Sequence, residues 1–351
     1  MNVEPLFNLM IEKKASDLFL TCHAPVKIKI EGKIMPVNKL EMTPKMVKQA
    51  AFELMTEDQM DEFNRELEID FALSEQGLGR FRVNVFHQRG SVSMVLRYIT
   101  SDLPTLEELG MPDQLKELVM LRRGLILMVG ATGAGKSTTL AAMINHRNEK
   151  TSSHIITIED PIEFLHPNKQ SIINQREVGL DTKSYSRALK SAVRGAPDVI
   201  QIGEIRDTES MRAALDMAGT GHLVLATVHS NNAPETLDRI INLFPQEQHG
   251  QVFMDLAHYL RAILSQRLVR ARNGKRVAAV ELMLNTPHIK DLILKGDISA
   301  VKEAHKDSGE QGMVSFDDAL LDLYKQGTIT MDEAMSHADS RANLEAKVNF
   351  G

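Results

Sequence analysis

The strongest constraint on the fold is the stretch GATGAGKSTT, Gly130 to Thr139, which directly follows the apolar run LILMV. Its spacing, Gly-x4-Gly-Lys-Ser, is that of a P-loop, in which a strand leads into a glycine-rich turn and then a helix. The glycines let backbone N–H groups converge on one point, and the helix adds the positive end of its dipole. The pattern therefore predicts a phosphate-binding turn in an α/β domain.

This turn is expected to bind ATP with Mg²⁺. Lys136 would meet the β- and γ-phosphates, and the Ser137 hydroxyl would bind Mg²⁺. The predicted nucleotide-contacting residues are Gly130, Thr132, Gly133, Ala134, Gly135, Lys136, Ser137 and Thr138.

The chain around the turn divides into two patterns. From Arg122 onward apolar strands alternate with helical stretches, which predicts a mostly parallel sheet. Residues 1–100 instead mix short strands and helices, which is typical of a smaller α+β domain. We expect a hinge with a short helix at 101–121, and a P-loop domain with a helical tail at 122–351.

Several local elements are specific enough to check. Residues 43–67 are expected to be helical, and two hairpins to turn at Glu31-Gly32 and Arg89-Gly90. A third hairpin has Asn273-Gly274 as a two-residue turn. In the tail, Ser315 and Thr330 have the spacing of helix caps.

Composition excludes some classes of protein. A net charge of −6 and a pI of about 6.1 argue against a dedicated nucleic-acid binder, so no nucleic-acid partner is expected. The lone cysteine, Cys22, rules out an intramolecular disulfide and a multi-cysteine zinc site, and we expect it to be buried. No stretch approaches the ~20 apolar residues of a membrane helix, and the N-terminus lacks the pattern of a signal peptide. The expected location is cytosolic, or peripheral on a membrane complex.

Acidic residues follow two predicted strands. DVIQIGE places Glu204 at the carboxyl end of a strand, where ligands of open α/β sheets gather, with Gly203 at the usual position of a metal-binding aspartate. We expect Glu204 to serve Mg²⁺. TIEDPIEF supplies Glu159, Asp160 and Glu163, of which Glu163 is a candidate general base. The residue pattern alone does not choose among these three.

Histidines and arginines complete the candidate set. His222 and His229 flank the apolar strand of GTGHLVLATVHS, where a histidine either touches the γ-phosphate or satisfies a backbone carbonyl. His229 is the better sensor candidate. In RFRVNVF, period two places Arg80 and Arg82 on one strand face, with Phe81, Val83 and Val85 on the other.

Four motifs in this order, GATGAGKST, TIEDPIEF, APDVIQIGEIRD and TGHLVLATVHS, resemble the Walker A, Asp box, Walker B and His box of secretion-type hexameric ATPases. The resemblance runs nearly end to end and includes ASDLFL, RFRVNVF and INQREV. Within that family the chain looks most like the type IV pilus retraction ATPases, the PilT/PilU family. The stretches AAMINHRNE and SIINQREVGLDT favour its PilU branch.

The resemblance implies a PAS-like N-terminal domain, a flexible linker, and a RecA-like ATPase domain, with six copies in a ring. Carried over by position, it makes Glu163 the catalytic glutamate, Glu204 the Walker B glutamate, and His229 a residue near the phosphate. It also implies that N-terminal arginines approach the nucleotide, so that Arg80, Arg82 and Arg97 become candidate arginine fingers.

The function that the resemblance implies is a cytoplasmic motor, peripheral at the inner-membrane pilus machine, that hydrolyses ATP to retract pili. Its expected partners are further copies in a homo-hexamer, a membrane platform protein and a PilT-like companion ATPase. Assembly ATPases of the same family typically carry a four-cysteine zinc insertion, which a chain with one cysteine cannot form. A DNA motor would fit the P-loop alone, but it fits neither the acidic chain nor the Asp box.

An accessory ring component that binds nucleotide but has little motor activity is the alternative. It is kept open by HIKDLI, positions 288–293, where the family commonly has AIRNLI and where Lys290 replaces arginine. Two further departures are Gly219 in place of a common glutamate and Ala196 in place of a common aspartate. The HIKDLI change leaves the predicted nucleotide chemistry untouched.

Overall fold

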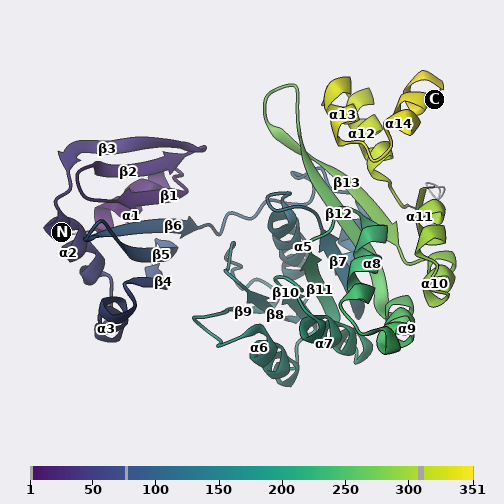
Figure 1. Ribbon diagram of the computed structural model, residues 1–351, viewed down its shortest axis with the longest axis horizontal. Helices are drawn as coiled ribbons and strands as arrows, with labels where there is room; N and C mark the ends of the chain where they lie inside the picture. Colours follow the sequence, from purple (N-terminus) through teal and green to yellow (C-terminus); the bar gives the residue numbers. More distant parts are fainter. Residues whose placement is uncertain (1–2, 76–77, 307–311, 351) are drawn as a thin grey trace. The chain divides into compact units, whose positions relative to one another are not determined.

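The computed structural model describes residues 3–75, 78–306 and 312–350. Its contacts divide the chain into two compact units (Figure 1). The first comprises Met1–Asp102 with Glu163–Leu165, and the second comprises Leu103–Ile162 with His166–Gly351. The first unit is α+β and the second is α/β, so the expected fold class is confirmed.

The first unit is built on a six-stranded antiparallel sheet in the order β3-β2-β1-β6-β5-β4. Its strands are β1 (Asp17–Leu20), β2 (Pro25–Ile30), β3 (Lys33–Glu41), β4 (Glu68–Glu75), β5 (Gly79–Gln88) and β6 (Ser91–Ile99), and its helices are α1 (Glu4–Glu12), α2 (Pro44–Glu53) and α3 (Glu57–Glu66).

Strand β5 follows its predicted alternation. Phe81, Val83 and Val85 are fully buried, and the Phe81 ring stacks on Phe7 of helix α1 at 4.6 Å between ring centroids. Arg80 and Arg82 lie on the opposite, partly exposed face. Burial of one face of the strand against helices therefore fixes the direction in which the arginines point.

Two predictions in this unit were wrong in detail. Residues 43–67 form two helices because Thr56 starts a new one: it accepts the N–H of Gln59, whose side chain accepts the N–H of Thr56. Cys22 is partly exposed, because it follows the end of β1 in a turn where His23 has a positive φ of 59°. Both predicted hairpin turns of this unit are confirmed, and each has a positive φ at both central residues.

Strand β3 forms one edge of the sheet. Eight of its nine residues are exposed, and among them are Ile34, Met35 and Leu40. Since β3 pairs with β2 alone in this sheet, its second row of backbone N–H and C=O groups faces outward.

The second unit contains a seven-stranded sheet in the order β13-β12-β7-β11-β10-β8-β9, parallel except for the β12–β13 hairpin. Its strands are β7 (Gly124–Val129), β8 (His154–Glu159), β9 (Ile172–Glu177), β10 (Val199–Ile202), β11 (Leu223–Val228), β12 (Leu260–Arg270) and β13 (Arg276–Leu284). Its helices are α4 (Gln114–Val119), α5 (Lys136–Lys150), α6 (Tyr185–Ala192), α7 (Thr208–Gly219), α8 (Ala233–Asn242), α9 (His249–Tyr259), α10 (Pro287–Leu294), α11 (Ile298–Lys306), α12 (Phe316–Lys325), α13 (Met331–His337) and α14 (Arg341–Phe350).

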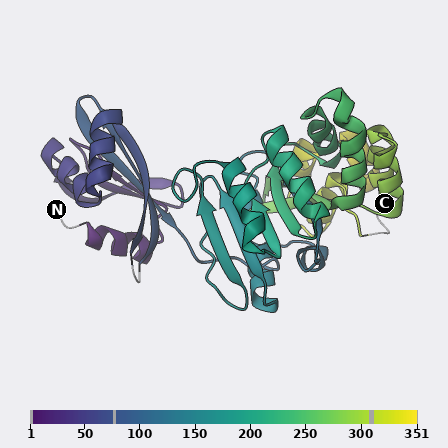
Figure 2. The same ribbon diagram turned by 90° about the horizontal axis from the view of Figure 1, so that it is seen from below.

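Helices cover both faces of this sheet (Figure 2). Strand β7 is buried throughout, and its residues alternate between two cores. Leu125, Leu127 and Val129 pack in the core that contains α7, α8 and α9, whereas Ile126 and Met128 pack in the core that contains α5. A strand that is apolar on both sides is what a parallel sheet between two helical layers requires.

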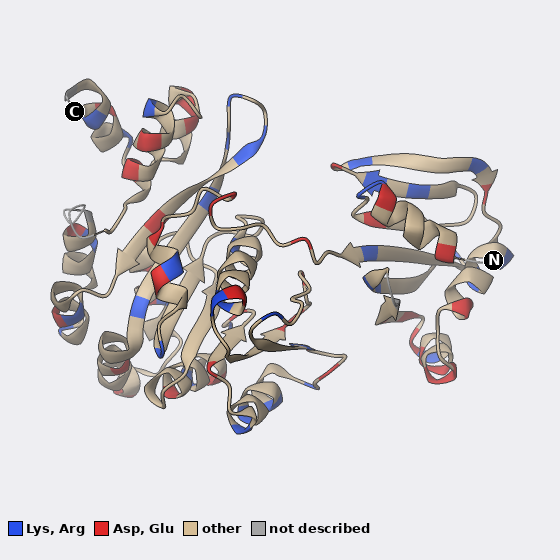
Figure 3. Cartoon of the chain, turned by 180° about the vertical axis from the view of Figure 1, so that it is seen from behind, with Lys and Arg blue, Asp and Glu red and all other residues tan. Residues whose placement is uncertain are grey.

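The C-terminal helices α12, α13 and α14 pack on the β12–β13 hairpin through a separate small core. The predicted caps are confirmed: Ser315 accepts the N–H of Asp318, and Thr330 accepts that of Glu333. The predicted two-residue turn was wrong. The strands end at Arg270 and Arg276, and the five residues between them are closed by the bond from Ala271 N–H to the Lys275 carbonyl. Basic residues gather at this loop (Figure 3).

Helix α10 carries the HIKDLI stretch. Ile289 and Ile293 are buried and Leu292 packs beside the main core, so the predicted helical spacing of apolar residues is confirmed. No helix in the described part of the chain combines the length and apolar composition that crossing a lipid bilayer requires.

The pairing of β1 with β6 generates a stability prediction. Asp17, 4% exposed, lies opposite Arg97 and accepts a 2.8 Å hydrogen bond from the Arg97 Nε, with a second bond from Ser16. Replacing Arg97→Ala leaves a buried carboxylate without its cation, so we expect the free energy of unfolding to fall by about 1–2 kcal/mol. Urea unfolding of the full chain measures this. Arg65→Ala, which removes an exposed pair with Glu66, is the control and should change the free energy of unfolding much less than Arg97→Ala does.

Candidate active site

The candidate site lies at the edge of the seven-stranded sheet where four adjacent parallel strands end. The P-loop follows β7, His229 follows β11, Glu204 lies two residues after β10, and Asp160 follows β8. Because parallel strands present their carboxyl ends at one edge, four stretches distant in sequence are brought together.

The P-loop has the geometry that its sequence predicts. Gly130, Gly133 and Gly135 adopt positive φ angles of 146°, 79° and 88°, which residues with a side chain rarely adopt. The turn runs from the buried end of β7 into α5, which begins at Lys136. The exposed stretch from Ala131 to Gly133 leaves the turn open to a ligand.

Lys136 is buried, and its ammonium group lies inside the turn. Its Nζ donates to the carbonyls of Gly130 at 2.7 Å and Ala131 at 3.0 Å. A buried ammonium group is suited to bind phosphate oxygens, with which it forms charge-assisted hydrogen bonds. Ser137 and Thr138 follow on the first turn of α5 and are partly exposed.

Gln266 of β12 braces the P-loop and was not predicted from the sequence. Its carbonyl lies 2.5 Å from where a Cβ on Gly130 would stand, and its Nε2 lies 2.7 Å from that position on Gly135. Its Oε1 accepts the buried hydroxyl of Thr139 at 2.8 Å. An uncharged polar side chain in a largely buried strand was the available signal.

A cavity of about 320 Å³ opens beside the P-loop. Glycine backbone forms one wall, and Asn231, Arg267, Arg276 and His337 supply polar groups around it. Its size falls at the lower end of the range for small-molecule sites. A glycine-walled turn with a buried ammonium and basic groups around it fits the phosphates and sugar of a nucleotide.

Glu204 and His229 meet at the end of β10. The Glu204 Oε1 lies 3.1 Å from His229 Nε2, and its Oε2 accepts from Arg206 at 2.7 Å. That hydrogen bond raises the pKa of the Arg206 guanidinium. Arg206 also lies 3.8 Å from Asp160 of the Asp box, so it joins the two acidic motifs. Arg206 was not singled out in the sequence, although it stands only two positions after Glu204.

Gly203, at the usual position of a metal-binding aspartate, and Gly219, one of the departures from the family pattern, both lie in crowded surroundings. A Cβ at Gly203 would meet the Tyr185 hydroxyl at 2.8 Å and the Ile158 carbonyl at 3.0 Å, so β8 and α6 leave no room for an aspartate. A Cβ at Gly219 would stand 2.9 Å from the ring of Tyr259. In both places a large aromatic side chain occupies the space that a carboxylate would need.

The three Asp-box carboxylates have different surroundings. Glu159 is buried and accepts hydrogen bonds from Thr157 and Gln175, whereas Asp160 is partly exposed beside Arg206. Glu163 is exposed, and its segment Glu163–Leu165 groups by its contacts with the N-terminal unit. The catalytic role of Glu163 stays a prediction.

The three candidate finger arginines share one face of the N-terminal sheet. Arg82 lies opposite Arg97 in the β5–β6 pairing, and Arg80 lies two residues from Arg82. Arg97 binds Asp17, and Arg82 Nε lies 3.8 Å from Asp70. Carboxylates thus offset part of this positive charge, and a finger role for any of the three stays a prediction.

The two histidines of the His box differ in what they contact. His222 Nδ1 lies 3.1 Å from the Met217 carbonyl, which is the structural role considered for such a histidine. His229 instead contacts Glu204. Of the two, His229 is therefore the one that lies with the predicted active-site residues.

His166, three residues after Glu163, generates a pH prediction. Its Nδ1 is enclosed and has no hydrogen-bond partner. Burial, and more weakly the nearby Lys169, lowers the pKa of His166 from 6.5 to about 4. The neutral ring is therefore the form that the folded state accepts.

Stability that depends on neutral His166 is fully present above pH 6.5 and is lost as the pH falls toward 4, since the unfolded chain binds the proton first. The loss is about 1.4 kcal/mol per pH unit, or about 3 kcal/mol in all. We expect the stability advantage of the wild type over His166→Gln to shrink by that amount between pH 7 and pH 4 in urea unfolding. Parallel pH curves would contradict this. The control is His258→Gln, which removes one histidine from an exposed position.

Comparison with known proteins identifies the family to which the chain belongs. Residues 2–335 match the model of the type II/IV secretion system protein family. The type IV pilus ATPase PilU of Pseudomonas aeruginosa is 50% identical, over 100% of this chain and 92% of PilU. The type IV pilus retractation ATPase PilT of the same organism is 40% identical, over 98% of this chain and all of PilT.

The solved structures include a close neighbour. The crystal structure of the pilus retraction motor PilT with bound ADP superimposes with a TM-score of 0.91 at 41% identity, covering 98% of this chain and 99% of that one. The predicted resemblance to the PilT/PilU proteins is thereby confirmed, and the higher identity to PilU agrees with the predicted branch. This chain is an ATPase of the type II/IV secretion system protein family, similar over its whole length to the type IV pilus ATPases.

Proposed function

We propose that this protein is a motor that hydrolyses ATP to drive the retraction of type IV pili. The observation that carries the proposal is the 50% identity to PilU along the entire chain, because such similarity extends to both units and not only to the P-loop. The 40% identity to PilT, which is named for retraction, supports the direction of movement. The single cysteine supports it too, since the zinc insertion typical of assembly ATPases needs four.

In the proposed site the P-loop, from Gly130 to Thr138, holds the triphosphate. Lys136 donates to the β- and γ-phosphates in place of the carbonyls it now contacts. Ser137 and Glu204 are the residues that would hold Mg²⁺, which neutralises charge that develops on the phosphates when bound. Glu204 acts without a carboxylate at the preceding residue, because Gly203 stands at the usual position of a metal-binding aspartate.

The remaining catalytic groups are proposed by position. Glu163 orients and deprotonates the attacking water, and His229 links the nucleotide to Glu204 through the pair already present. Arg80, Arg82 or Arg97 supplies positive charge to the transition state. Such an arginine raises the rate by ~10³ to 10⁵ in other phosphoryl-transfer enzymes, so moving it would control hydrolysis.

The proposed assembly is a homo-hexameric ring, peripheral at the cytoplasmic side of the inner-membrane pilus machine. Its partners are a membrane platform protein, on which the ring does work, and a PilT-like companion ATPase. An accessory ring that binds nucleotide but does not turn over would share the fold and the P-loop, and the experiments below separate the two.

Glu163→Gln tests the chemistry. Loss of a positioned base should lower the turnover number by ~10² or more while leaving ATP affinity within about twofold. Phosphate release and titration with a fluorescent ATP analogue measure the two quantities. Lys136→Ala is the contrasting variant and should abolish binding itself. Near-normal turnover in Glu163→Gln would move the catalytic role to Glu159, Asp160 or Glu204.

The cellular role is tested by deleting the gene in a piliated host, with and without the companion ATPase. A retraction motor predicts hyperpiliation and lost twitching in one of these backgrounds, rescued by the wild-type gene and not by the Glu163→Gln variant. Rescue by that variant would instead support the accessory role, because an accessory ring needs no turnover.

A further inference from the structure

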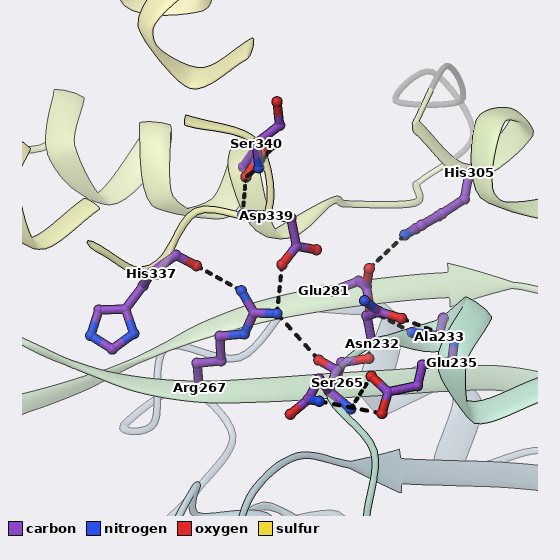
Figure 4. Close-up of polar contacts among 12 residues, drawn as sticks. Asn232, Ala233, Glu235, Ser265, Arg267, Glu281, His305, His337, Asp339 and Ser340 are labelled. Carbon is purple, nitrogen blue, oxygen red and sulfur yellow. Dashed lines mark hydrogen bonds and ion pairs between the residues drawn. The ribbon is translucent and has the colours of Figure 1, made fainter. Parts of the chain in front are cut away.

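Arg267 of strand β12 joins three parts of the ATPase unit (Figure 4). Its Nη1 donates to the His337 carbonyl at 2.6 Å, and its Nη2 lies 2.6 Å from Asp339 Oδ1 and 3.4 Å from the Asn231 carbonyl. The guanidinium carbon lies 3.8 Å from the centroid of the Phe316 ring. The same residue lines the cavity beside the P-loop.

The contacts on the C-terminal side are strong. The bond to Asp339 is charge-assisted, and His337 is the last residue of α13, where the negative end of the helix dipole attracts a cation. Stacking on Phe316 of α12 adds a cation–π contact. The Arg267 side chain is only 22% exposed, so these interactions are partly shielded from water.

The contact between Arg267 and the stretch that follows the His box is the weak one. At 3.4 Å the bond to the Asn231 carbonyl is long, and hydrogen bonds weaken as they lengthen. Asn231 lies two residues after His229, which contacts Glu204. Only one residue therefore separates the Asn231 carbonyl from a side chain of the predicted nucleotide site.

The neighbouring segment is held in place independently. Glu281 of β13 is buried and accepts the N–H of Ala233, the first residue of α8, at 2.8 Å and the hydroxyl of Ser265 at 2.5 Å. These bonds fix the start of α8 against the hairpin (Figure 4). The link between the His-box stretch and α12–α14 thus runs through Arg267, while α8 itself stays anchored.

We propose that Arg267 is a positioning residue that couples nucleotide binding to the arrangement of the C-terminal helices α12, α13 and α14. A nucleotide in the P-loop cavity changes the Arg267–Asn231 contact, and the guanidinium carries that change to His337, Asp339 and Phe316. The inference rests on the proposed function, since it assumes that the cavity binds a nucleotide.

The test measures hydrogen–deuterium exchange across residues 331–350 in the full chain, with and without Mg²⁺·ADP. The wild type should exchange at least threefold more slowly when ADP is bound. Asp339→Ala removes the far end of the link without touching the cavity lining. It should bind ADP within about twofold of the wild type and lose this nucleotide-dependent difference.

Two more variants separate coupling from a structural role. Arg267→Lys keeps a cation beside Asp339 but cannot reach three acceptors at once, so it should also lose the ADP-dependent difference. Lys347→Ala removes the ion pair between Lys347 and Asp318 inside the same helical group. This variant should keep the ADP-dependent difference in exchange. A purely structural role would change exchange equally with and without ADP.

The outcomes are distinguishable. If the wild type binds no ADP, the proposed function fails and this inference with it. If it binds ADP and residues 331–350 do not respond, or if both Asp339→Ala and Arg267→Lys keep the full response, only the coupling role of Arg267 is overturned.

Discussion

Gln266 of strand β12 lies so close to the P-loop that neither Gly130, which faces its backbone carbonyl, nor Gly135, which faces its side-chain amide, has space for a side chain. That approach keeps side chains out of the turn, whose glycines adopt left-handed backbone angles, and the buried Lys136 ammonium donates to the Gly130 and Ala131 carbonyls inside it. It also places Arg267, the next residue, at the cavity wall. One contact between a strand and a turn thus sets the phosphate site and its connection to the C-terminal helices.

Much of this arrangement could be predicted because its causes are local. The glycine spacing of residues 130–135 requires positive φ, and alternation along β5 requires Phe81 to be buried and Arg82 to face away. The parallel sheet then brings Glu204 and His229 together, because each follows a strand of that sheet. Residues that directly follow a strand of such a sheet can therefore be predicted from the sequence.

What could not be predicted depends on partners distant in sequence. Gln266 braces the P-loop through contacts with Gly130, Gly135 and Thr139, the last of them 127 positions away. The space beside Gly203 is taken by Tyr185 and the Ile158 carbonyl. The break at Thr56 was missed for another reason: its signal is local, the spacing of Thr56 and Gln59 in a capping box, and it was not used. Glu163 and the three arginines group with the N-terminal unit. No strand of the seven-stranded sheet positions them, so their roles could not be checked in the same way.

Strand β3 bears on how such a protein stays soluble. Its outward row of peptide groups and the side chains of Ile34, Met35 and Leu40 are what another extended chain needs in order to add itself to a sheet. Pro36 removes one donor from that row, and Lys33 and Lys39 add like charges that two copies would have to bring together. Charged side chains on an edge strand disfavour pairing with a second copy, so Lys33 and Lys39 oppose the edge-to-edge association that the exposed apolar residues of β3 would otherwise favour.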